Sequence, residues 1–135
     1  MAKVWRILAL VVVMTASAGC ARDVQVYNVD GHPIPQAAQS LSMTEIKSVI
    51  MLAGADRGWT FEEVGPGEIA ATLLVRTHTA RVNIQYSQAS YSIRYKDSVN
   101  LRYTGSTIHR NYNKWIMKLE QDIEGDLQRR GLQSG

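Results

Sequence analysis

The stretch WTFEEVGPGEIAATLLVRTHTARVNIQYSQASYSIRYK, residues 59–96, sets the architecture of this 135-residue chain. Apolar and polar residues alternate along it, and the alternation stops at Gly65-Pro66-Gly67, at Thr77-His78 and from Ser87 to Ser90. A period of two is typical of strands that are buried on one face, and Gly, Pro and Ser are typical of turns. The stretch therefore predicts four antiparallel strands joined by three tight turns.

The strand register that these turns imply can be checked against the apolar pattern. All three turns bring large apolar residues opposite one another on a single side of the sheet, as a half-buried meander requires. The expected pairs are Phe61–Ala71, Val75–Ala80, Leu73–Val82, Ala71–Ile84, Val82–Tyr95 and Ile84–Ile93.

A helix is predicted on each side of this stretch. Ser42-Met43-Thr44-Glu45 fits a capping box at the start of the first helix, and Arg57-Gly58 is typical of its end. The second helix is expected over about residues 110–130, although Gly125 inside it costs about 1 kcal/mol relative to Ala. Its apolar face consists of Tyr112, Trp115, Ile116, Leu119, Ile123 and Leu127.

Together these elements predict an α+β domain over residues 41–131. It is expected to be a two-layer sandwich, in which a four-stranded antiparallel meander carries the N-terminal and the C-terminal helix on its apolar face. Residues 20–40 contain Asp30-Gly31 and two prolines, which favour turns and extended backbone, so we expect a partly ordered tether there. An edge strand through its valines is the alternative. Residues 132–135 form a tail.

The first twenty residues have the pattern of a secretory leader. Lys3 and Arg6 supply a positive start, residues 7–18 form an uncharged apolar run, and small residues precede Cys20, which is the only cysteine. The run is too short for a comfortable membrane span, which needs about 20 apolar residues. Residues 1–19 are therefore predicted to be a signal peptide that is removed. An ordinary secreted protein with one buried cysteine is the alternative.

Charge excludes one class of partner. Without Lys3 and Arg6, the chain carries 13 Lys and Arg residues against 12 acidic ones, so the basic character of the full sequence comes mainly from the leader. A nearly neutral domain is not expected to bind nucleic acid.

The residues before Cys20 resemble the lipobox of bacterial lipoproteins, although Ser17 stands where Leu is usual. The resemblance implies acylation of the Cys20 thiol and cleavage before it, which leaves a lipid anchor, and Ala21 in place of Asp implies the periplasmic side of the outer membrane. Further along, the chain is similar to small lipoproteins of Gram-negative bacteria, which implies a location and a domain shape and names no catalytic residue. The residues that carry this similarity are Gly65-Pro66-Gly67, Ala71-Thr72-Leu73, Arg76-Thr77-His78, the run from Tyr91 to Tyr95 and the run from Ile108 to Trp115.

No catalytic or metal site is expected from the motifs. The three histidines, His32, His78 and His109, lack the close spacing and the neighbouring Cys or carboxylate ligands that metal sites use. No Gly-x-Ser-x-Gly elbow is present. We therefore expect no metal, no cofactor and a non-enzymatic adaptor or accessory role in the cell envelope.

Two candidate binding surfaces remain. The polar corner from His109 to Asn113 could form a small binding site, and the alternative is that Asn111 or His109 caps the last helix. A small envelope hydrolase or ligand-binding protein that uses this corner or the basic sheet face is the alternative function. The polar face of the sheet is expected to carry four cations, with Arg81 directly opposite Lys96. Such a pair is unfavourable unless an anionic envelope component or an acidic protein docks there, and a plain solvated face is the alternative. The four cations are Arg76, Arg81, Arg94 and Lys96.

Overall fold

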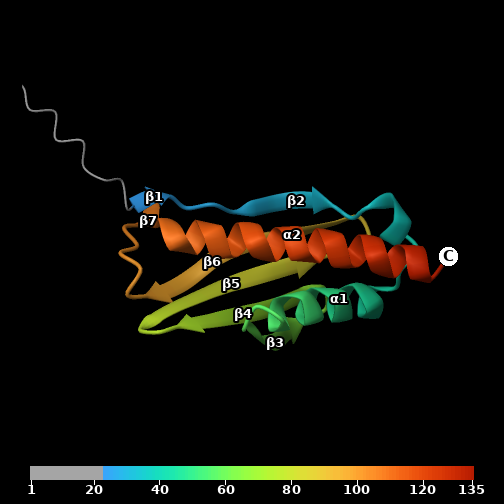
Figure 1. Cartoon of the computed structure of the whole chain (residues 1–135), viewed down its shortest axis with the longest axis horizontal. Coiled ribbons are helices and arrows are strands. Elements are labelled where there is room, and N and C mark those ends of the chain that lie inside the picture. Colours follow the sequence, from blue (N-terminus) through green and yellow to red (C-terminus); the bar gives the residue numbers. More distant parts are fainter. Residues whose placement is uncertain (1–22) are drawn as a thin grey trace, which may run out of the picture.

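The computed structural model describes residues 23–135, which form two antiparallel sheets and two long helices (Figure 1). The predicted signal peptide and Cys20 lie outside the described residues. The elements are β1 (Asp23–Gln25), β2 (Val29–Pro33), the 3-10 helix η1 (Gln36–Ala38), α1 (Met43–Ala55), β3 (Thr60–Gly65), β4 (Glu68–Val75), β5 (His78–Tyr86), β6 (Ser90–Val99), β7 (Thr107–His109) and α2 (Arg110–Gln133).

The main sheet has five antiparallel strands in the order β2-β6-β5-β4-β3, and β1 pairs with β7 in a separate two-stranded sheet. The α+β class and the antiparallel meander are confirmed, whereas the expected count of four strands is wrong. The fifth strand, β2, comes from the segment that we expected to be a tether, and it is an edge strand that pairs with β6, as the alternative interpretation of this segment proposed. Ile34 and Ala38, which follow β2, are buried in the core. Residues 23–40 therefore form part of the folded domain.

The register of the meander follows the sequence at both of its ends and differs in the middle. Phe61 pairs with Ala71 and Ile84 with Ile93, as predicted. Between β4 and β5, however, Val75 pairs with His78 instead of Ala80. The other expected β4–β5 pairs move in the same way: Leu73 pairs with Ala80, and Ala71 with Val82.

A tight turn explains this difference. Only Arg76 and Thr77 connect β4 to β5, and Arg76 has a φ of 56°. Two-residue hairpin turns need positive φ values, which Gly and Asn usually supply, so no residue type in the sequence indicated that the turn lies at Arg76-Thr77 instead of the predicted Thr77-His78. The resulting shift is two residues. Because side chains alternate with a period of two, every residue keeps its predicted face.

Both helices pack on the apolar face of the main sheet and contribute to one hydrophobic core (Figure 1). The capping box at α1 is confirmed, because the Ser42 hydroxyl accepts a hydrogen bond from the Glu45 backbone N–H and the Glu45 carboxylate accepts one from the Ser42 N–H. The buried stripe of α2 contains five of the six predicted residues, namely Tyr112, Ile116, Leu119, Ile123 and Leu127. The sixth, Trp115, is only half-buried.

Among the described residues, no helix combines the length and the apolar composition that crossing a membrane requires.

The two glycines of α2 have opposite surroundings. A Cβ on Gly131 would overlap the backbone of Ala37 and Ala38 in η1, so a side chain cannot be accommodated there without moving the 3-10 helix. A Cβ on Gly125 would meet only the guanidinium group of Arg129, at 3.6 Å. Of the two glycines, only Gly131 is needed for the close approach of α2 to η1.

This contrast yields a matched pair of variants. Gly131→Ala should lower the free energy of unfolding by about 1–3 kcal/mol, because overpacking against a backbone forces it to shift. Gly125→Ala should raise it by up to about 1 kcal/mol through helix propensity. Urea denaturation of the two variants measures both effects. Equal changes of the same sign would show that α2 does not pack on η1 as described.

Candidate binding cleft

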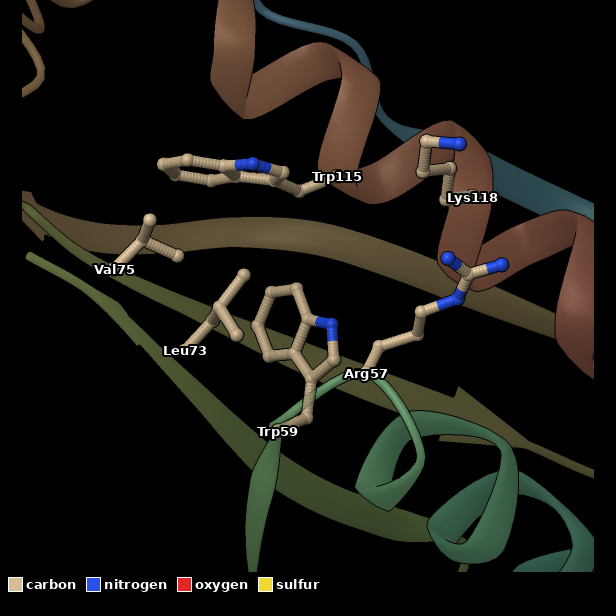
Figure 2. A pocket seen from close by; sticks show the side chains of 6 residues that line it. All are labelled: Arg57, Trp59, Leu73, Val75, Trp115 and Lys118. Atoms are coloured by element: carbon tan, nitrogen blue, oxygen red, sulfur yellow. The ribbon is translucent and has the colours of Figure 1, made fainter.

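A cleft of about 180 Å³ opens between α2 and the inner face of β4 (Figure 2). In Figure 2 the indole of Trp115 lies above the opening, and the side chains of Trp59, Leu73 and Val75 rise toward it from below. Two cations, Arg57 and Lys118, lie at one end of the opening (Figure 2). The cleft thus has apolar walls and a basic rim.

Three elements position these walls. Gly58, with a φ of 92°, ends the α1 region and turns the chain so that Trp59 enters the core. Leu73 and Val75 are inward-facing residues of β4, and Trp115 lies at the edge of the buried stripe of α2. Trp59 is 3 % exposed and Leu73 is 5 % exposed, so they form a buried floor. Trp115 is half-buried and forms an accessible wall.

The two rim cations differ in their pairing. The Nε of Arg57 donates to a carboxylate oxygen of Asp122 at 2.6 Å, and this hydrogen bond raises the pKa of the guanidinium group. Within residues 23–135, Lys118 takes part in no salt bridge. Its positive charge is therefore available to a ligand.

Lys118 continues a row of cations along α2. Arg110 and Lys114 precede it at intervals of four residues, a spacing that places all three on the same side of a helix. All three are exposed, and in the described part of the chain neither Arg110 nor Lys114 forms a salt bridge. The row extends the basic rim along the helix surface.

The rings of His78 and His109 lie close to each other beside this cleft. Their centroids are 6.3 Å apart, and His78 lies 6.5 Å from Trp115. His78 donates through Nδ1 to the carbonyl oxygen of Asn100 at 2.6 Å. The sequence did not predict that these rings lie close together, because their proximity depends on the β4–β5 turn lying beside the start of α2.

The corner from His109 to Asn113 has a structural role. The Nδ1 of His109 accepts a hydrogen bond from the Asn111 N–H at 3.1 Å and caps α2, as the second of our two interpretations predicted. The side chain of Asn113 accepts from the N–H of Tyr27 at 2.9 Å and donates to the carbonyl of Gln25 at 2.8 Å. These contacts hold the segment between β1 and β2 against α2.

His32 lies in a network that the sequence did not reveal. Its Nδ1 lies 2.8 Å from Glu120 Oε1, and its Nε2 lies 3.1 Å from Glu124 Oε2. The ring also stacks on Tyr91, with centroids 4.9 Å apart. The Tyr27 hydroxyl donates to Glu120 at 2.6 Å, and this bond, together with burial, raises the pKa of Tyr27 to about 12. The only sequence signal was the spacing of Glu120 and Glu124, which places both on one side of a helix.

The predicted basic face of the sheet is corrected in two places. A β-bulge beside Arg81 places it opposite Asp97 instead of Lys96, and the two form a salt bridge of 2.8 Å. Arg94 pairs with Asp30 on the new edge strand, also at 2.8 Å. Arg76 lies in the β4–β5 turn, and Lys96 is exposed on β6. The expected like-charge pair is therefore wrong, and half of this face is neutralised within the domain.

The described residues offer no metal site, because no three His, Cys, Asp or Glu side chains among them are arranged to hold an ion.

The pKa of His109 provides a test of its capping role. Burial lowers this pKa, and the positive charge of Arg102 adds to the effect, as do His78 and Arg110, while Asp23 opposes it. Folding therefore disfavours the protonated ring. The stability that the neutral ring contributes is present above its unfolded pKa, near 6.5, and is lost as the pH falls through that value toward the lower folded pKa.

His109→Asn keeps a capping side chain that does not titrate. The wild-type protein should therefore lose more stability than the variant between about pH 7 and pH 5. Urea denaturation of both proteins across this range measures the difference. Parallel loss of stability in the two proteins would contradict the account of His109.

Comparison with known proteins provides no relative, because no family model, no curated protein and no solved structure matches the chain.

Proposed function

We propose that this chain is a non-enzymatic adaptor or accessory protein of the bacterial cell envelope, anchored through a lipidated Cys20 at the periplasmic side of the outer membrane. The leader, with its positive start, short apolar run and small residues before the only cysteine, supports the anchor. Ala21 after the cysteine supports the outer membrane as the destination, by similarity to lipoproteins. In this role the folded domain offers surfaces for binding.

The observation that carries the non-enzymatic part of the proposal is how the three histidines are held. His32 is bound by two carboxylates, His78 donates to a backbone carbonyl and His109 caps a helix. Each ring thus has a structural partner within the domain. The three rings therefore contribute contacts that hold the fold together, and this structural use supports a non-enzymatic role.

The short distance between anchor and domain has a consequence for this role. β1 begins at Asp23, only three residues after Cys20, and three extended residues span about 10 Å. The lipid would therefore hold the β1–β7 sheet close to the membrane surface. The protein would act on partners near that surface, unlike a protein on a twenty-residue tether.

A ligand-binding protein of the envelope is the second candidate function. The cleft between Trp59 and Trp115 favours it, because small-molecule sites are concave and mostly apolar with a few polar groups. At about 180 Å³ the cleft is smaller than the roughly 300–1,000 Å³ of typical ligand pockets. This size favours a single inserted side chain, which suits an adaptor.

Lipidation is tested at Cys20. In cells that receive labelled palmitate, the wild-type protein should carry the label and fractionate with the outer membrane, because two or more acyl chains give stable attachment. Cys20→Ser should abolish both the label and the normal cleavage of the leader. Ser17→Leu, which introduces the usual lipobox residue, should retain both and serves as the control. An unlabelled wild-type protein found free in the periplasm would contradict the proposal.

A further inference from the structure

We infer that the cleft between Trp59 and Trp115 binds an aromatic side chain of an acidic, extended segment of a partner protein. The inference rests on the proposed adaptor role, in that the cleft binds and does not catalyse, and it is independent of the lipid anchor. Three properties of the cleft lead to it: its volume, its lining and the charge beside it.

Volume limits what the cleft can hold. An engineered apolar cavity of about 150 Å³ in another protein binds benzene, so the 180 Å³ here accommodates one aromatic ring. Whole cofactors and drug-sized ligands need a larger site. A ring that enters the cleft must therefore belong to a larger molecule that makes its remaining contacts outside.

The lining favours an aromatic ring. Two indoles and two aliphatic side chains surround the space, and the ring of Trp115 lies across its opening (Figure 2). Aromatic pairs interact more favourably than their buried area alone explains. Aromatic residues are also enriched among the side chains that dominate binding at protein interfaces. An inserted ring would contact Trp115 on one side and the part of Trp59 that lines the cleft on the other.

Charge identifies the residues that flank the ring. Lys118 lies at the cleft. Toward the N-terminus of α2, Lys114 and then Arg110 lie at intervals of four residues, and each interval is about 6 Å along the helix. Residues two apart in an extended chain are separated by about 6.6 Å and point to the same side. An extended segment with an aromatic residue followed by Glu at every second position would therefore align its carboxylates with this row of cations.

A membrane surface is the competing occupant, because the row of cations and the nearby anchor would also suit anionic lipids. The shape of the cleft favours a protein segment. Trp59 forms its floor and is only 3 % exposed, so a flat headgroup layer would not reach it, whereas a single protruding side chain would. A binding experiment can separate the two occupants.

The experiment uses the full-length protein as purified from cells, from whichever fraction contains it, so that failure of the anchor does not affect the result. The probe is the peptide Gly-Phe-Gly-Glu-Gly-Glu-Gly with blocked termini, and calorimetry measures its dissociation constant. Saturable binding is expected. Replacing Phe by Ala in the peptide should weaken binding by about tenfold or more, and replacing both Glu by Gln should weaken it by several-fold.

Protein variants locate the site. Lys118→Glu should weaken binding of the peptide by about tenfold, because it reverses the charge at the cleft. Lys96→Glu makes the same change on the polar face of the sheet and should leave binding unchanged. Trp115→Ala should abolish binding, and circular dichroism checks that this variant is folded. If Trp115→Ala unfolds, Lys118→Glu still provides a decisive test. Binding of the wild-type protein should also weaken when NaCl rises from about 0.05 M to about 0.5 M.

Three results would overturn the inference. The first is the absence of saturable binding, and the second is equal binding of the Phe and Ala peptides. The third is binding to vesicles of phosphatidylglycerol that is sensitive to Lys118→Glu while the peptide does not bind, which would assign the cleft to the membrane. In each case the palmitate experiment on Cys20 remains a separate test of the anchored adaptor.

Discussion

Packing of the α2 stripe against the apolar face of the sheet is the contact on which the rest of the domain depends. Its five buried residues are completely covered, and they share one core with β4, β5, β6 and α1. Each large buried side chain contributes roughly 1.5–3 kcal/mol by leaving water. Near the end of the same helix, Gly131 lets η1 approach, so α2 also fastens the segment that follows β2.

The two flanks of α2 use this docking differently. On one flank Glu120 and Glu124 bind His32, and the Tyr27 hydroxyl donates to Glu120, so the polar groups satisfy one another and hold β2 at the edge of the sheet. On the other flank Trp115 lies over Trp59 without filling the space between them. The first flank also has a hollow, of about 350 Å³, but His32, Tyr27 and the two carboxylates that line it are hydrogen-bonded to one another. The second flank leaves an apolar cleft beside Lys118, which forms no salt bridge within residues 23–135. Binding is therefore assigned to the second flank.

Features set by local chemistry could be predicted from the sequence. The capping box at Ser42, the Ile84–Ile93 pair and the stripe of α2 follow from patterns within a few residues. Features set by distant partners could not. His32 contacts Glu120, which lies 88 residues away in the sequence. β2 is an edge strand, which tolerates Gly31 and Pro33, but these two residues argue against a strand in the sequence, so the edge strand was only the alternative there. The cleft was missed for the same reason, since Trp115 was expected to be buried in the core and not to form a wall.

Backbone irregularities account for the remaining differences. Arg76 adopts a positive φ in the β4–β5 turn, and a bulge lies beside Arg81. Arginine is not a residue type that indicates either conformation in a sequence. The turn shifts the register by two residues and preserves every face, so the predicted core survives. The bulge brings Arg81 opposite Asp97 and removes the charge repulsion on which the predicted anion-binding face depended.

The most direct test of the central claim, that α2 and the sheet together form the binding surface, is an NMR measurement of the isotope-labelled protein with the unlabelled Phe peptide. Intermolecular NOEs should connect the Phe ring to the methyl groups of Leu73 and Val75 and to the indole protons of Trp115. NOEs from the ring to residues around Arg81 and Lys96, or to none of the cleft residues, would contradict the account.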